Sequence, residues 1–390
     1  MLFCDSPEHA TFRKQLKDFL AVELPTDDWN MYSDRDHVTP ARSAFTSEFR
    51  KKLASRGWLT MSWPEAFGGA GADAMTQTVY MEEMSYAGAP GAYEQGVWLA
   101  APALMAHGTD EQQQRWLPAI RNAESDWCQL FSEPGAGSDL ASLQTRAVKD
   151  GDDYIVNGQK IWTSGAMDAD WGILIARTDP EAPKHRGISY FLLDMKTPGV
   201  TVRPLINNLD SAHFCEVFFE DARVPASCRI GEENRGWYIT AATLDQERSS
   251  INRVVMTKST LEALLDYVRA DAYLKGRSQI RRELVDRFVE FEVARWLCYR
   301  VAEMQSRGLV PNYEASISKV MGTELQRQMG GTGLRVLGLV GQLEGDSKYA
   351  PLRGRAERWT LAGPSYTVAG GTSEVNRNII ATRGLGLPRA

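Results

Sequence analysis

The chain has 390 residues, a length that favours two or three domains rather than one. Hydrophobic residues make up 43% and charged residues 24%, which is the balance of a protein that buries extensive cores. The net charge of −6 gives no electrostatic reason to expect nucleic acid or an anionic membrane as a partner, and no apolar run approaches the ~18 residues that cross a bilayer.

The cysteines and histidines give no sign of a disulfide framework or a metal site. Five cysteines are scattered without a CxxC pair, and five histidines are equally dispersed. The first residues, from Met1 to Pro7, lack the basic and apolar regions of a secretory signal. We therefore expect a cytoplasmic protein with no metal, whose chemistry needs carboxylates, hydroxyls or an organic cofactor.

The hydrophobic pattern changes twice along the chain. Residues 1–125 are apolar at helical spacing, and Thr109 to Gln112 form a helix-start pattern. Residues 126–230 contain short apolar runs separated by Gly, Pro and Asp, which predict a β-barrel or sandwich. Residues 231–390 return to helical spacing without strands, which predicts a four-helix bundle that also forms an oligomer interface. The expected fold class is α+β multidomain, with an N-terminal α-helical domain, a middle β-domain and a C-terminal bundle.

Two local patterns refine this expectation. Asn157-Gly158 follows the apolar run Tyr154–Val156 and is a two-residue hairpin signal. Further strands are expected over residues 171–178, 188–195 and 216–219. In the third domain, one predicted helix has an apolar face, at steps of three and four residues, made of Leu284, Phe288, Phe291, Ala294, Leu297, Val301 and Met304.

The first segment with candidate chemistry runs from Gln129 to Leu140. It is rich in small residues and carries hydroxyls at Ser132 and Ser138, so its backbone N–H groups can approach a polar or anionic ligand closely. An ordinary strand-to-turn connection explains the same residues equally well.

The second segment, Asn157–Gly165, places Trp162 beside Thr163 and Ser164 on a predicted strand. An indole plane there suits a flat aromatic cofactor, although core packing is the commoner role of such a tryptophan.

The third segment, Gly370–Arg377, opens the last helix with Thr372 or Ser373 as its cap. Its free N–H groups can bind an anion or a carbonyl. The alternative is a helix cap with no further role.

Together, in this order on an α-β-α chain, the three segments resemble the acyl-CoA dehydrogenase family. The resemblance covers nearly the whole chain and includes Asp221–Pro225 and Leu244–Arg248. It implies an enzyme that binds FAD and an acyl-CoA substrate. In this reaction the α-proton is abstracted, a hydride passes from Cβ to flavin N5, and an electron-transfer flavoprotein reoxidises the flavin.

The resemblance also implies site residues, with Ser164 facing flavin N5. FAD contacts are expected at Phe131, Ser132, Gly137, Ser138, Trp162, Thr163, Ser164, Thr372 and Glu374. Substrate contacts are expected at Ser138, Asp245, Arg248, Gly370 and Gly371.

The most familiar family members carry a catalytic glutamate where this chain has Gly370. Glycine cannot take a proton, but its N–H can still hold the thioester carbonyl. In the isovaleryl-CoA and long-chain branches the glutamate lies at the position of Glu247, which is therefore the predicted catalytic base. The alternative is that Glu247 complements a helix dipole and pairs with Arg248 or Arg253.

Two further departures bear on the substrate and the cofactor. Ala369 and Gly370 replace larger side chains of the straight-chain members, so a bulky, branched or cyclic acyl group is expected. The residues that bind the adenosine half of FAD stay unassigned for two reasons. Arg277–Arg281 lacks the Phe-Gly that the family has there, and the family's later motif, a Gln with a Gly pair, could correspond either to Gln328–Gly331 or to Val336–Gly338.

The loss of a recognisable adenosine site leaves two assemblies open, a homotetramer or an α₂β₂ heterotetramer with a homologous subunit. The segment Arg335–Gly338 and the C-terminal Gly386–Pro388 resemble the heteromeric members that act on steroid side chains and dicarboxylic thioesters. Two other functions also stay open: an oxidase on the same fold, and a supporting subunit without a base. Gly370 favours the supporting subunit, and Glu247 argues against it.

Overall fold

The computed structural model describes residues 5–25, 40–244 and 250–388. Backbone contacts divide the chain into two compact units, each assembled from segments that are distant in sequence. Unit 1 comprises residues 1–35, 72–92 and 248–390, and unit 2 comprises residues 36–71 and 93–247.

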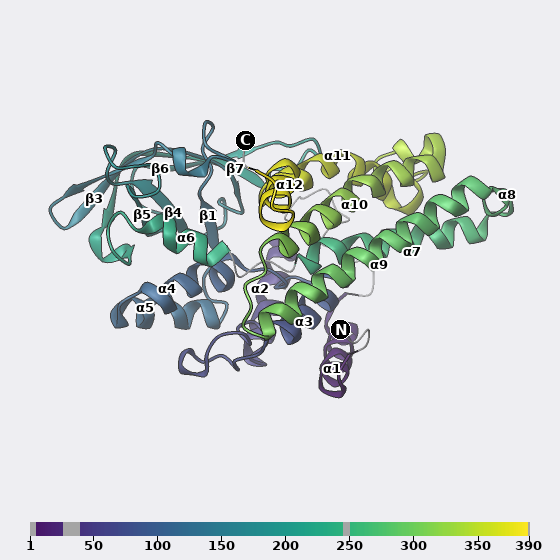
Figure 1. Cartoon of the computed structure of the whole chain (residues 1–390), viewed down its shortest axis with the longest axis horizontal. Coiled ribbons are helices and arrows are strands. Elements are labelled where there is room, and N and C mark those ends of the chain that lie inside the picture. The colour runs from purple at the N-terminus through teal and green to yellow at the C-terminus, as the bar shows by residue number, and fades with distance from the viewer. Residues whose placement is uncertain (1–4, 26–39, 245–249, 389–390) are drawn as a thin grey trace. The chain divides into compact units, whose positions relative to one another are not determined.

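Unit 1 is built from helices, and the long helices α7, α9 and α10 run alongside one another with α8 at one end (Figure 1). Its elements are α1 (Pro7–Glu23), α3 (Ala74–Tyr86), α7 (Ile251–Ala270), α8 (Ala272–Gly276), α9 (Ser278–Ser306), α10 (Tyr313–Leu337), η5 (Gly338–Gln342), η6 (Pro351–Gly354), α11 (Arg355–Val368), α12 (Ser373–Ile379) and η7 (Ile380–Gly384). Helix α10 is the centre of the unit, because it contacts α7, α9, α11 and α12. Its approach to α11 is close: a Cβ at Gly330 would lie only 2.5 Å from the backbone N of Thr360.

Helix α9 buries most of its predicted apolar face but also presents a second one. Leu284, Phe291, Ala294 and Val301 of this face are buried, whereas Phe288 is 50% exposed. The exposed apolar side chains of α9 recur at steps of three and four residues, so they share one side of the helix. This exposed stripe consists of Val285, Phe288, Val289 and Val293.

Buried charges join the N-terminal helices to α9. Arg13 of α1 donates to Glu82 of α3 at 2.7 Å and to the hydroxyl of Tyr299 of α9 at 2.7 Å. Arg295 of α9 pairs with the same glutamate. Burial raises the pKa of Glu82, but Arg295 and Arg13 outweigh burial, so its pKa lies below the usual range. The carboxylate therefore stays ionised and holds three helices together.

Unit 2 is a sheet with helices. Its strands are β1 (Trp127–Leu130), β2 (Arg146–Asp150), β3 (Asp153–Ser164), β4 (Trp171–Arg177), β5 (Ile188–Asp194), β6 (Val200–Leu205), β7 (Phe214–Pro225) and β8 (Arg229–Ile230). The order is β6-β7-β3-β2-β4-β5-β8, and β1 pairs with β4 in parallel. The helical elements are α2 (Pro40–Ser55), η1 (Glu65–Phe67), η2 (Gly96–Ala100), α4 (Ala101–His107), α5 (Asp110–Arg121), η3 (Leu140–Ser142), η4 (Ala226–Cys228) and α6 (Gly236–Leu244).

Local capping sets the start of α5. Thr109 accepts from the backbone N of Gln112 at 3.3 Å, and Gln112 Oε1 accepts from the N of Thr109 at 2.9 Å. This reciprocal capping box satisfies two N–H groups that the helix itself leaves unpaired, which confirms the predicted helix start.

The hairpin predicted at Asn157-Gly158 is wrong, because β3 continues through these residues as one strand of 12 residues. The register against β7 shifts between Val156 and Gly158, which marks a bulge. Asn157 Nδ2 donates to Asp221 of β7 at 2.9 Å, and the N–H of Asp221 donates back to Asn157 Oδ1 at 2.9 Å. The strands on both sides of β3 thus keep the chain extended and override the local turn signal.

The bulge predicts a large effect of Gly158→Ala. A Cβ at Gly158 would lie 2.8 Å from the Cα of Thr145, and the φ of Gly158 is +145°. We expect the free energy of unfolding, measured with denaturant, to fall by about 2 kcal/mol or more. Gly151→Ala is the matched control, because Gly151 also has a positive φ but no atom within 4 Å of its Cβ position. Equal losses in the two variants would contradict the collision with Thr145.

Candidate functional site

A buried ion pair fastens the loop after β1 to β3. Lys160 has no exposed surface, and its Nζ lies 2.8 Å from Glu133 Oε1 and 3.0 Å from the carbonyl oxygen of Phe131. The backbone N–H groups of Gln144 and Thr145 donate to the same carboxylate at 2.6 and 2.9 Å. The loop therefore has a fixed inner side, and Gly135, Gly137 and Ser138 are exposed on its outer side.

Both members of this pair are charged at neutral pH. Burial lowers the pKa of Lys160 to about 8, and the attraction of Glu133 opposes part of that shift. Burial raises the pKa of Glu133, but Lys160 and the N–H of Gln144 outweigh it, so the net shift is downward. The ion pair thus persists at pH 7.

Trp162 stands at a second bulge of β3, directly beside this loop. The register against β7 shifts between Lys160 and Thr163, and Trp162 has a left-handed backbone with φ +61°. Its indole is 60% exposed and meets Phe214 edge-on, with ring centroids 6.1 Å apart. A strained backbone that exposes a large aromatic plane is a feature of ligand sites rather than of cores.

The bulge also brings the two hydroxyl segments together. The N–H of Ile161 donates to the carbonyl oxygen of Ser132 at 2.9 Å, so Ser132 lies next to the strand that carries Trp162. Ser132 and Ser164 are half-buried, whereas the side chain of Thr163 is fully buried. Only the backbone of Thr163 can therefore meet a ligand at this surface.

The outer part of the loop is open. Gly137 and Ser138 are exposed, and no atom lies within 4 Å of a Cβ placed at Gly137. Small side chains around an exposed indole, with half-buried hydroxyls at its edge, fit a flat heteroaromatic ring that accepts hydrogen bonds. The residues of unit 2 are therefore compatible with a flavin.

The third segment forms a tight turn in unit 1. Gly370 and Gly371 have φ values of +66° and +87°, and Thr372 caps α12 by accepting from the N of Val375 at 3.1 Å, which confirms the predicted cap. The side chain of Glu374 is 79% exposed. The turn is thus anchored by the cap while its glycines stay open to a ligand.

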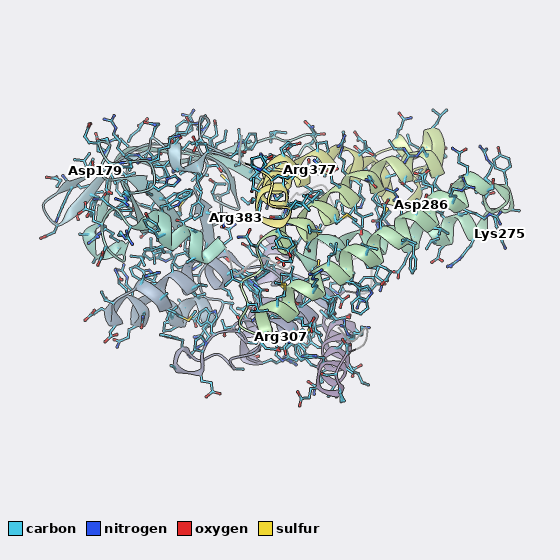
Figure 2. All side chains as sticks on the ribbon, viewed as in Figure 1. Asp179, Lys275, Asp286, Arg307, Arg377 and Arg383 are labelled. Carbon is cyan, nitrogen blue, oxygen red and sulfur yellow. The ribbon has the colours of Figure 1, made fainter. Side chains whose placement is uncertain are left out.

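Helix α12 is tied to α10 through Glu324. Ser373 donates to Glu324 Oε1 at 2.8 Å, and Arg377, labelled in Figure 2, donates to the same oxygen at 3.1 Å. The carboxylate of Glu324 therefore fixes the first turn of α12 and, with it, the glycine turn.

The structure thus groups the predicted residues into a loop-and-strand set in unit 2 and a turn set in unit 1. Asp245, Glu247 and Arg248 lie outside the described residues. Sequence reasoning did not single out Lys160 and Glu133, although a lysine at an inward position of an apolar strand is a usable signal. Within the described ranges, no three His, Cys, Asp or Glu side chains gather as a metal-binding set, and no helix is long and apolar enough to cross a membrane.

Three domain models of one family match the chain in order. The acyl-CoA dehydrogenase N-terminal domain matches residues 6–124, the middle domain matches residues 128–222, and the C-terminal domain matches residues 234–385. The chain belongs to the acyl-CoA dehydrogenase family. It is an FAD-dependent oxidoreductase with the helical, β-sheet and helical domains of that family.

Its relatives include acyl-CoA dehydrogenases of Mycobacterium tuberculosis. IpdE1 is 36% identical over 87% of this chain and 88% of its own length, and FadE26 is 35% identical over 99% and 98%. The structure titled Tcur3481-Tcur3483 steroid ACAD has a TM-score of 0.90 at 32% identity, and the ChsE4-ChsE5 complex from M. tuberculosis has 0.88 at 34%, both over the full length of each chain. A prolyl acyl carrier protein oxidase, AnaB, has 0.82 at 25% identity over 98% of this chain and 100% of its own.

The buried ion pair predicts a large loss of stability in Glu133→Gln. The variant leaves a lysine charge without its counter-ion in the interior, so the free energy of unfolding should fall by about 3–5 kcal/mol. Adding Lys160→Met should recover much of the loss, because no buried charge then remains. Asp139→Asn is the control, since it breaks the exposed pair with Lys184 and should change unfolding little. A small loss in Glu133→Gln would contradict the role of the pair.

Proposed function

We propose that this acyl-CoA dehydrogenase acts on a bulky, branched or cyclic acyl group and passes its electrons to an electron-transfer flavoprotein. The observation that carries the proposal is the turn at Gly370, where the familiar members of the family have a glutamate. Ala369 and Gly370 themselves carry little side-chain bulk, although Nη2 of Arg253 lies 3.2 Å from the Cβ position of Gly370. A relative's structure titled steroid ACAD supports a large acyl group.

Each set of residues has a separate task in this proposal. FAD, when bound, supplies the two-electron acceptor for the hydride from Cβ. The indole of Trp162 and the hydroxyls of Ser132 and Ser164 bind and orient its ring. The N–H of Gly370 holds the thioester carbonyl, which acidifies the α-carbon, and Glu247 removes the α-proton.

The alternative function on the same fold is an oxidase. The structure of AnaB, which is titled an oxidase, is similar to this chain and supports this alternative. An oxidase lets oxygen reach the reduced flavin, whereas a dehydrogenase excludes it. Reoxidation of thioester-reduced flavin in air within seconds would favour the oxidase. A screen of coenzyme A thioesters, with flavin bleaching as the readout, would identify the acyl group in either case.

If the indole of Trp162 stacks on the flavin, its removal should weaken FAD binding. Trp162→Ala removes an exposed aromatic plane, and stacking of this kind contributes about 1 kcal/mol, so the Kd for FAD should rise roughly 5- to 10-fold. Titration of apoprotein with FAD measures this change. Val148→Ala, which truncates another exposed side chain of the same sheet, should leave the Kd unchanged. Unaltered FAD affinity in Trp162→Ala would remove the indole from the site.

If Glu247 is the catalytic base, its substitution should slow flavin reduction without weakening FAD binding. General-base removal typically slows a reaction ~10²–10⁴-fold, so Glu247→Gln should slow flavin reduction by at least about 10² while FAD content stays normal. Glu374→Gln, at a largely exposed carboxylate, is the comparison. If Glu247→Gln reduces its flavin at nearly the wild-type rate, the base lies elsewhere, and Glu374 and Asp245 become the candidates.

We also propose that the chain assembles with a homologous subunit as an α₂β₂ heterotetramer. The exposed stripe of α9 supports an interface, because four apolar side chains on one helix side are costly to leave in water. The similar structures titled Tcur3481-Tcur3483 and ChsE4-ChsE5 each name two proteins. The missing adenosine motif supports a different chain, rather than a copy, as the source of the remaining FAD contacts.

The proposed heterotetramer predicts the amount of FAD bound per chain and the substitution that dissociates the assembly. Expressed alone, the chain should hold less than one FAD per chain, and a homologous partner should restore binding. Phe288→Asp should dissociate the assembly in native mass measurements, because it places a charge in the stripe of α9. Val22→Asp, at an exposed position of α1, should not. One tightly held FAD per chain in a stable homo-oligomer that turns over unaided would exclude the heteromer.

A further inference from the structure

A buried arginine at the end of β4 binds three backbone carbonyl groups. Arg177 is the last residue of the strand and is 8% exposed. Its Nη2 donates to the carbonyl oxygen of Ala141 at 2.6 Å, its Nε donates to that of Leu143 at 3.2 Å, and its Nη1 donates to that of Lys184 at 3.1 Å. A planar guanidinium carries donors that point in several directions, so one side chain serves all three carbonyls.

These carbonyls belong to two different loops of unit 2. Ala141 and Leu143 lie in and directly after η3, in the loop that carries Ser138, whereas Lys184 lies in the loop between β4 and β5. A further link between the loops is the ion pair of Lys184 with Asp139 at 2.7 Å, but both of these side chains are more than half exposed. Exposed ion pairs contribute little to stability. The buried guanidinium is therefore the stronger of these two links.

Ser138 lies between two fixed points of its loop. On one side, Ala136 and Glu133 exchange two backbone hydrogen bonds, both of 3.0 Å. On the other side, the fixed point is Ala141, whose carbonyl the guanidinium holds. Without that bond, the next described hydrogen bond that ties the loop to Glu133 is donated by the N–H of Gln144. The guanidinium thus shortens the part of the loop that is free to move around Ser138.

We propose that Arg177 is a positioning residue that holds the loop carrying Ser138 in the conformation that binds FAD. The inference rests on the proposed function, and on Ser138 being a cofactor contact as the family resemblance implies. Arg177 acts through the backbone of the loop. A loop that is mobile in the free protein has to be ordered when the ligand binds, and this ordering weakens the binding.

Amide hydrogen exchange of the FAD-loaded full-length protein tests the link itself. Arg177→Met removes all three donors while keeping a side chain in the interior. The N–H groups of Ser142 and Leu143 in one loop, and of Arg186 in the other, are hydrogen-bonded within their own loops. All three should exchange at least about 10-fold faster in the variant, whereas the amides of β5 should keep their wild-type rates. Faster exchange in only one loop, or in neither, would overturn the proposal.

Two further variants separate the hydrogen bonds from the charge. Arg146 of β2 pairs in register with Arg177, but its side chain is exposed, so Arg146→Met removes an equal charge and should leave both loops unchanged. Arg177→Lys keeps the buried charge, but an ammonium lacks the planar fork and should restore only part of the protection. Wild-type protection in Arg177→Lys would show that the three hydrogen bonds are not required, which contradicts the proposal.

The affinity for FAD tests the consequence for the site. Titration of the apoprotein should show a Kd about 10-fold higher in Arg177→Met. Ser138→Ala should weaken FAD binding in the wild-type background but add little in the Arg177→Met background, because a mobile loop no longer presents the hydroxyl. An unchanged Kd in Arg177→Met, or fully additive losses in the double variant, would refute the role of Arg177.

A failure of the proposed contacts gives a different result. If Ser138→Ala alone leaves the Kd unchanged, Ser138 is not an FAD contact. In that case the exchange rates and the Kd of Arg177→Met decide the role of Arg177 without the double variant.

Discussion

The buried pair of Lys160 and Glu133 is the constraint on which the ligand-facing surface of unit 2 depends. A lysine without exposed surface is tolerated only with a counter-ion and further hydrogen bonds, and Glu133 and the carbonyl of Phe131 provide both. Because Glu133 is bonded to Lys160 and to the backbone at Gln144, the loop cannot move away from β3 without exposing a charge to the interior. The exposed small residues of the loop, Gly137 and Ser138 among them, are thereby held at the surface of unit 2.

A bulge adjacent to this pair turns the indole outward. Trp162 has φ +61° and is 60% exposed, two features that the sheet alone does not favour. Lys160 inside and Trp162 outside are two residues apart, and regular alternation would place them on the same face. The shift in register between Lys160 and Thr163 allows one strand to supply both the anchor and the exposed ring.

In unit 1, the space at the glycine turn is likewise set by a residue that is distant in sequence. The absence of a side chain at Gly370 leaves room for Arg253, whose Nη2 lies 3.2 Å from the Cβ position of that glycine. Gly370, which departs from the familiar family pattern, thus lies beside Arg253, a residue 117 positions earlier in the chain. In the same unit, α9 carries apolar side chains on two sides, and those of one side (Val285, Phe288, Val289 and Val293) are exposed.

The sequence by itself determined the features that depend on near neighbours in the chain. The order of helical, β and helical regions, the capping box at Thr109 and the cap at Thr372 arise from side chains within a few residues of one another. The family, its cofactor and the three candidate segments could also be read from the sequence.

Tertiary structure decided what depends on distant partners. The Asn157-Gly158 bulge replaced a hairpin because β2 and β7 pair with β3, and the packing of the described helices leaves Phe288 of α9 half exposed. The meeting of Arg253 with Gly370 has no local signal either. Such contacts are fixed by packing between elements that are far apart in sequence, and the free energy of that packing outweighs local preference.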